Sequence, residues 1–227
     1  MDDERDAASA TFITAAESFR DVVARIAPDA WEQAALGVWS VRDLVGHTSR
    51  ALSTVQAYLG KEPSASRLGG PVAYFLAVRP ALADPGTVAR RGKETGAALG
   101  EDPASAVATL AREVIDVVAG SAAGATVTTP VGTMALSDYL PTRTFELAVH
   151  TLDLTRALGI PAPASLRPAV TASCELAGRL ASQLPAAPEF LLALTGRTSF
   201  GQHLSVGCKN PQPVPPLGPY GHQHLQG

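Results

Sequence analysis

Apolar side chains recur every three or four residues in four long segments of the chain. These segments span residues 12–26, 44–59, 107–118 and 140–158. This spacing gathers the apolar side chains on one face of a helix, so each helix has a single face to bury. The pattern therefore predicts a mainly all-α fold, in which four helices pack as an antiparallel four-helix bundle around a shared core.

Shorter signals predict where helices begin and which other elements surround the bundle. The residues that resemble helix N-caps are Ser40, Asp84 and Asp102. Additional helices are expected at about residues 72–83 and 165–184. Residues 127–134 are rich in β-branched side chains and predict a small β-hairpin or an extended loop. Residues 190–194 are apolar and fit either a strand or a helix end.

The same signals suggest how the chain is divided. We expect a helical bundle over residues 1–160, a C-terminal helix with a short extension over 161–206, and an irregular proline-rich tail over 207–227. Trp31 and Trp39 both lie in the loop before the second long helix. Because tryptophan buries a large apolar surface, this loop is expected to fold over the core.

Composition narrows the classes of function. Hydrophobic residues make up 46% of the 227 residues and charged residues 17%, with a net charge of −3 and no basic block. Nucleic-acid binding needs clustered Lys and Arg, so no nucleic-acid partner is expected. The acidic N-terminus does not resemble a signal peptide, and no apolar run is long enough to span a membrane. We therefore expect a cytoplasmic protein with no membrane partner, as a monomer or a homodimer.

Three residues form a candidate metal site. Glu146 and His150 lie four residues apart on an expected helix, so their side chains share one face. A Glu/His pair at this spacing also occurs often by chance on solvated helix faces. His47 lies at the edge of the buried face of another helix, where it is either a third ligand or a hydrogen-bonded core histidine. A His, Glu, His set would leave a fourth coordination position open, which is typical of catalytic zinc. His203, His222 and His224 are interpreted as surface histidines.

Two segments resemble a known family. Residues 39–47, WSVRDLVGH, resemble the signature W-S-v-x-d-l-v-x-H of the mycothiol-dependent maleylpyruvate isomerase N-terminal domain family, a branch of the DinB-like superfamily. Residues 143–154, RTFELAVHTLDL, are similar to its second signature, R-x-x-E-x-x-x-H-t-x-D-l. The resemblance covers about residues 8–200. The founding isomerases carry a second, α/β domain after the bundle, whereas this chain resembles a short variant without the full C-terminal domain.

The resemblance implies a fold, a cofactor and a chemistry. The family fold is an up-down four-helix bundle with a divalent metal ion at one end of its core, and its ligands correspond to His47, Glu146 and His150. Zinc suits this set because it accepts sulfur and has no redox chemistry. The family uses mycothiol, a low-molecular-weight thiol, as cosubstrate. The resemblance thus implies a metal-dependent, thiol-using transferase or isomerase that acts on an electrophilic small molecule.

The neighbours of the candidate ligands have two interpretations each. Asp153 either orients a ligand histidine or is a solvated aspartate near a helix end. Arg143 either pairs with Glu146 or contacts an acidic substrate. Arg79 either offers its guanidinium to a substrate carboxylate or is a surface residue. For the whole protein, the alternative hypothesis is a non-catalytic bundle that binds a metal or ligand as a sensor or accessory protein.

Overall fold

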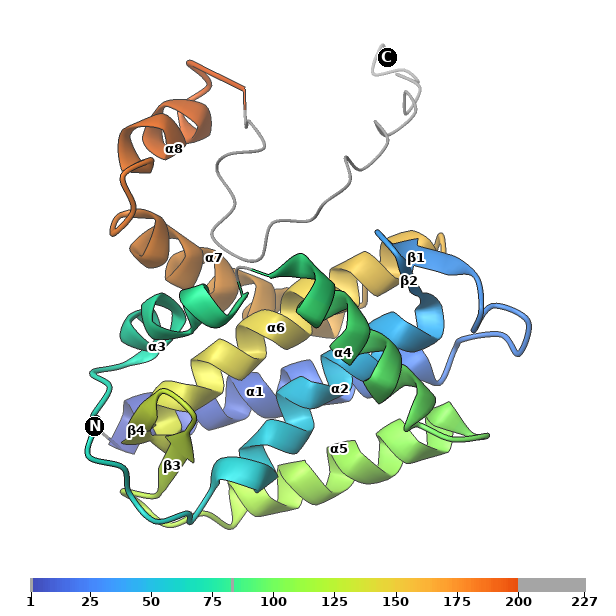
Figure 1. Cartoon of the computed structure of the whole chain (residues 1–227), viewed down its shortest axis with the longest axis horizontal. Coiled ribbons are helices and arrows are strands. Elements are labelled where there is room, and N and C mark those ends of the chain that lie inside the picture. Colours follow the sequence, from blue (N-terminus) through green and yellow to red (C-terminus); the bar gives the residue numbers. More distant parts are fainter. Residues whose placement is uncertain (1, 83, 200–227) are drawn as a thin grey trace, which may run out of the picture.

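The computed structural model describes residues 2–82 and 84–199, and within these the chain is mainly helical. The four bundle helices are α1 (Asp2–Val23), α2 (Val41–Tyr58), α5 (Pro103–Ala119) and α6 (Leu136–Ala157). Each of the four segments with helical periodicity lies largely within one of these helices, so the all-α prediction is confirmed. In Figure 1, α1 and α6 run from left to right, and α2 and α5 run in the opposite direction. The bundle thus runs up, down, down and up.

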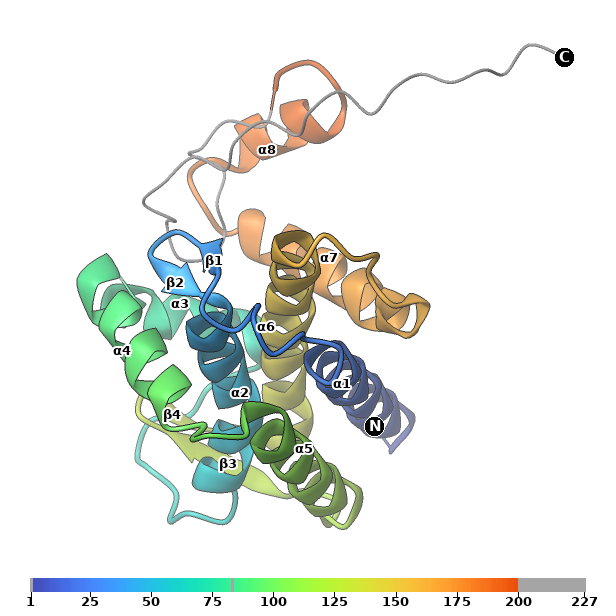
Figure 2. The same cartoon turned by 90° about the vertical axis from the view of Figure 1, so that its right-hand side faces the viewer.

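The remaining helices lie outside the bundle, and the last of them extends away from it (Figures 1 and 2). They are α3 (Pro71–Val78) with the 3₁₀ turn η1 (Arg79–Leu82), α4 (Pro85–Ala97), the turn η2 (Ala164–Leu166), α7 (Arg167–Ala181) and α8 (Ala187–Leu194). Helix α4 lies outside α2, and α7 packs on α6 (Figure 2). The apolar segment 190–194 is therefore helical. The described residues do not include the proposed tail 207–227, which contains His222 and His224. His203 also lies outside them.

Two small antiparallel ribbons close the ends of the bundle. One pairs β3 (Thr126–Thr129) with β4 (Gly132–Ala135), which confirms the expected hairpin. The other pairs β1 (Ala34–Leu36) with β2 (Trp39–Ser40), where the sequence had predicted only a loop. Trp31 and Trp39 are both buried, as expected for a segment that folds over the core.

The helix starts follow the predicted caps. Ser40 and Asp43 form a capping box at the start of α2, because each side chain accepts from the other's backbone N–H. Asp84 accepts from the backbone of the first turn of α4, and Asp102 does the same for α5 through Ser105. Within the described ranges, no helix is both long and apolar enough to cross a membrane.

Helices α2 and α4 approach closely because glycines face each other at their crossing. A Cβ atom added to Gly46 would overlap the backbone nitrogen of Gly96, and one added to Gly96 would come within 2.9 Å of Asp43. Any side chain at these positions would force the two helices apart. The contact fixes α4 against the same helix that carries His47.

This contact leads to a prediction about stability. Gly46→Ala should lower the free energy of unfolding by about 1–3 kcal/mol, because the new methyl group overlaps backbone that has no room to move. Gly178→Ala is the matched control, since Gly178 lies in α7 with no atom within 4 Å of an added Cβ. This control should raise stability by about 0.5–1 kcal/mol through helix propensity. Urea unfolding measures both changes, and equal midpoints for the Gly46→Ala variant and the parent would contradict the packing argument.

Candidate metal centre

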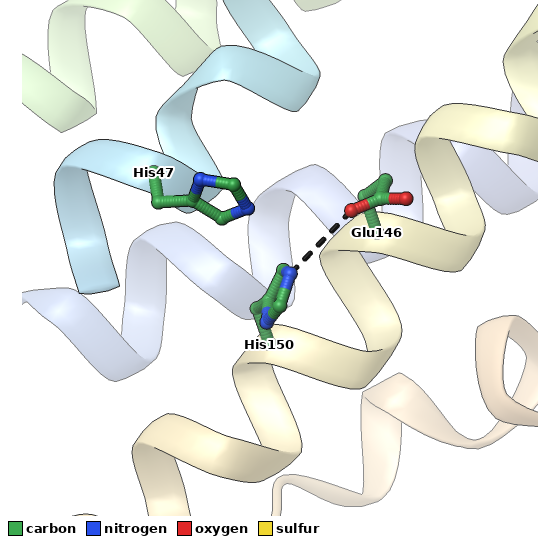
Figure 3. A group of neighbouring side chains, drawn as sticks. All are labelled: His47, Glu146 and His150. Atoms are coloured by element: carbon green, nitrogen blue, oxygen red, sulfur yellow. Dashed lines mark ion pairs between the residues drawn. The ribbon is translucent and has the colours of Figure 1, made fainter. Parts of the chain in front are cut away.

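The three candidate ligands come from two neighbouring bundle helices. His47 lies in the second turn of α2, and Glu146 and His150 lie one turn apart on α6. One ligand atom from each residue lies within 4.8 Å of the other two. Figure 3 shows the three side chains directed toward a common space between the helices. The sequence motifs, nearly a hundred positions apart along the chain, thus converge on one site.

The distances and the donor types fit a divalent ion. His150 Nε2 and Glu146 Oε2 lie 3.4 Å apart. Two ligand atoms bound to zinc at about 2.0–2.1 Å with tetrahedral angles are themselves about 3.3 Å apart. The pair on α6 therefore already has the spacing of two zinc ligands. Two imidazoles and one carboxylate form a donor set that zinc binds with one position left for a further ligand.

Asp153 holds the ring of His150 from the side opposite Glu146. Its Oδ2 lies 3.2 Å from Nδ1 of His150. A proton shared on that side keeps Nε2 directed toward Glu146, which is the tautomer that a metal ligand needs. Of the two interpretations of Asp153, this contact supports the one in which it orients the histidine.

The two histidines have opposite pKa shifts. Burial, followed by the charge on His150, lowers the pKa of His47 to about 3. Burial alone would also lower the pKa of His150, but hydrogen bonds to Asp153 and Glu146 and their negative charges raise it to about 9. Burial would raise the pKa of Glu146, yet the hydrogen bond and charge of His150 and the charge of Arg143 lower it to about 2. At neutral pH in the metal-free site, His47 is therefore neutral, Glu146 is ionised and His150 carries a proton on both ring nitrogens.

Trp39 is a site residue whose role the sequence did not reveal. Its ring lies 4.5 Å from that of His47, centroid to centroid, and its Nε1 donates to the Ala89 carbonyl of α4. The rings of His47 and His150 are 4.9 Å apart and nearly perpendicular. Among the described residues, Nδ1 of His47 has no hydrogen-bond partner. Packing, rather than a hydrogen bond, thus sets the orientation of His47.

Arg143 is buried beside the site. It is 8% exposed, and its guanidinium lies 4.9 Å from the ring centre of Tyr139 and 5.4 Å from that of Tyr74. Its Nε donates to Thr142 and its Nη2 to the Tyr74 hydroxyl. In the described part of the chain no carboxylate lies within ion-pair distance of it. Its charge lowers the pKa of Glu146 without a direct contact.

Arg79 lies apart from this cluster. It begins η1, after α3, and its side chain is exposed, with no hydrogen bond or ion pair to other described residues. The structure thus brings Asp153 and Arg143 to the candidate ligands but leaves Arg79 at the surface. Tyr74 and Tyr139, which surround Arg143, were not singled out by the sequence because aromatic residues at helical spacing ordinarily form core.

Comparisons with known proteins bear on this site. No curated protein and no solved structure gave a match to the chain. A family model, the mycothiol maleylpyruvate isomerase N-terminal domain, matches residues 12–155. This span exceeds half of the 227 residues, covers most of the four-helix bundle and contains all three candidate ligands. The match connects the His, Glu, His cluster with mycothiol-related, DinB-like metal binding. The chain belongs to the mycothiol maleylpyruvate isomerase N-terminal domain family.

Proposed function

We propose that this protein is a metal-dependent enzyme that uses a low-molecular-weight thiol, mycothiol, to modify an electrophilic small molecule. The observation that carries the proposal is the cluster of His47, Glu146 and His150 in a chain of a mycothiol-linked family. Three protein ligands leave room for one more, which favours a site for chemistry over a closed structural site. Zinc is the proposed ion because it accepts nitrogen, oxygen and sulfur donors together.

The chain's own residues would prepare this site in distinct ways. A bound divalent ion would stabilise the thiolate form of a coordinated thiol and so supply a nucleophile at neutral pH. Asp153 would keep the proton of His150 on Nδ1 and leave Nε2 for the ion. Arg143 would hold positive charge beside Glu146, and Arg79 is proposed as an outer contact for a substrate carboxylate. Addition of the thiolate to an electrophile gives a transferase, and addition followed by elimination gives an isomerase.

The proposed partners follow from this chemistry. They are the thiol and one electrophilic small molecule, without nucleic acid or membrane, and the protein is proposed to act in the cytoplasm as a monomer or homodimer. We expect the fold not to depend on the ion, because all four bundle helices contribute buried apolar side chains to the core. Loss of the metal should thus remove activity and leave the chain folded.

The ligand assignment predicts metal content. Purified protein should hold one divalent ion per chain, and His47→Ala or His150→Ala should lose most of it, because water replaces a lost protein ligand poorly. Elemental analysis after gel filtration gives the ratio, and circular dichroism verifies that the helices remain. Glu146→Gln should weaken metal binding, whereas Glu113→Gln, an exposed glutamate on α5, is the matched control and should retain the ion. Full metal content in both histidine variants would exclude the site.

The pKa shifts predict proton release on metal binding. At pH 7 His47 is neutral and Glu146 ionised, whereas His150, with its pKa raised to about 9, carries a proton on each nitrogen. Because the ion must displace the proton from Nε2, uptake should release about one proton per metal at pH 7. Release should fall toward zero above pH 9, and metal affinity should rise with pH up to that point. Asp153→Asn should lower the pKa of His150 and reduce the release at pH 7.

Titration calorimetry in buffers with different heats of ionisation measures this proton count. A count near zero at pH 7 in the parent protein would show that His150 is already neutral. A count near two would mean that His47 is protonated as well, against the effect of its burial.

Activity tests the proposed function directly. Metal-loaded protein, supplied with mycothiol and a panel of electrophiles that includes maleylpyruvate, should show turnover that requires the thiol. Chelation or Glu146→Gln should reduce turnover at least tenfold, since the nucleophile depends on the ion. Product analysis distinguishes a thioether from an isomerised electrophile. If no panel member turns over and no thiol binds, the non-catalytic sensor or accessory role becomes the better account. Turnover that survives chelation would place the chemistry elsewhere.

A further inference from the structure

Two half-buried arginines lie beside the candidate metal centre and take no part in the ligand set. Arg50 follows His47 by three residues on α2, so both side chains lie on nearly the same face of that helix. Arg91 lies on α4, next to Gly92, where an added Cβ would overlap the ring of Trp39. Because Trp39 in turn packs on His47, the backbone of Arg91 is held close to the site.

The close packing of α2 on α4 brings these two positive charges together. Gly46 and Gly96 allow the helices to approach until their backbones touch. The charges of both Arg50 and Arg91 act on His47, where they help to lower its pKa. Burial and then the charge of Arg91 lower the pKa of Arg50, and Arg143 adds to this effect. The arginines are therefore near enough to repel each other.

Among the residues that the structure describes, neither arginine has a partner that would offset this repulsion. Arg42, on the same helix as Arg50, pairs with Glu32 at 2.8 Å, and Arg90, next to Arg91, pairs with Glu94 at 3.0 Å. Over residues 2–82 and 84–199, the side chains of Arg50 and Arg91 show no ion pair, and no hydrogen bond from either is found. A partly buried charge without a partner costs free energy, which a bound anion would recover.

The balance of charge at the site favours the same conclusion. The charges of Arg50 and Arg91 act on His47 and the charge of Arg143 acts on Glu146. The negative charges of the site are Glu146 and Asp153, and a divalent ion would add two further positive charges. The guanidinium of Arg143 lies against the rings of Tyr74 and Tyr139, and its positive charge acts on Glu146 without a direct contact. Arg50 and Arg91 are both partly exposed, so their guanidinium groups remain open to a ligand.

We propose that Arg50 and Arg91 form an oxyanion subsite beside the metal centre, which binds a carboxylate or phosphate group of the molecule that the site takes up. The planar guanidinium presents paired N–H donors that match either oxyanion. The inference rests on the proposed function for the position of the metal, and it adds the chemical class of the ligand. Both arginines lie outside the two sequence signatures, although Arg50 follows the first by only three residues.

The test compares two thiols that differ in one charged group. The full-length protein is loaded with cobalt(II), and thiol binding is followed by the thiolate-to-cobalt absorption band. 3-Mercaptopropionate carries a carboxylate, and 2-mercaptoethanol is neutral. The parent protein should bind 3-mercaptopropionate at least about tenfold more tightly, as expected for a charge-assisted hydrogen bond. Arg50→Gln and Arg91→Gln should each remove most of that preference, which is the ratio of the two affinities, because any effect of the lost charge on the bound thiolate itself is common to both thiols.

The controls separate recognition of the anion from general charge and from misfolding. Arg90→Gln removes an equal charge from the same helix turn and should keep the full preference, since Arg90 is exposed and paired with Glu94. Arg50→Lys keeps the charge without the paired donors and should retain part of the preference. Cobalt content and circular dichroism show whether each variant is folded and loaded.

The outcomes distinguish failure of this inference from failure of the proposed function. If 2-mercaptoethanol binds but the carboxylate gives no preference, the oxyanion subsite is wrong and the thiol site stands. If neither thiol binds, the proposed function fails, and the oxyanion subsite is then tested with metal-free protein. In that sample, sodium phosphate or sodium propionate should raise the melting temperature above that in sodium chloride of equal ionic strength, and Arg50→Gln should abolish the rise. The more effective anion identifies the group, and no rise with either overturns the subsite.

Discussion

Helices α2 and α6 lie side by side in the bundle, and their burial against each other forces His47 close to Glu146 and His150. The other features of the site depend on this contact. Helix α2 buries leucines and valines on its inner face and α6 buries leucines, so neither can rotate to move its polar residues into water. Two imidazoles and a carboxylate are thereby held where solvation is poor. Such an arrangement is costly without a ligand, and an ion that binds all three would offset the cost.

In the metal-free site, the protonation states of the two histidines reduce the free-energy cost of burying these polar groups. His47 is kept neutral by burial, whereas His150 keeps a proton because it lies between Glu146 and Asp153. One proton therefore occupies the position that a metal would take. Exchange of that proton for an ion leaves the hydrogen bond from His150 to Asp153 in place, so the ring need not reorient.

A second contact, between α2 and α4, adds positive charge near His47 and packs Trp39 against it. The glycine contact between these helices brings α4 near enough for Trp39 to donate to its backbone and to cover His47. The same approach brings Arg91 near enough for its charge to lower the pKa of Arg50. A thiolate and a second anionic group would both be favoured in this field, which links the proposed nucleophile with the proposed class of ligand.

The sequence by itself determined the helices and the identity of the candidate ligands. Apolar periodicity marks the four bundle segments, and the caps at Ser40, Asp84 and Asp102 mark helix starts, because both signals depend on residues close together in the chain. The two signatures named the family and the His, Glu, His set. Only the tertiary structure decided what surrounds that set. The position of Trp39 over His47 depends on how α4 packs against α2. So does the proximity of Arg50 to Arg91, neither of which forms an ion pair within the described part of the chain. Helix-to-helix distances arise from contacts between distant segments, which local patterns do not encode.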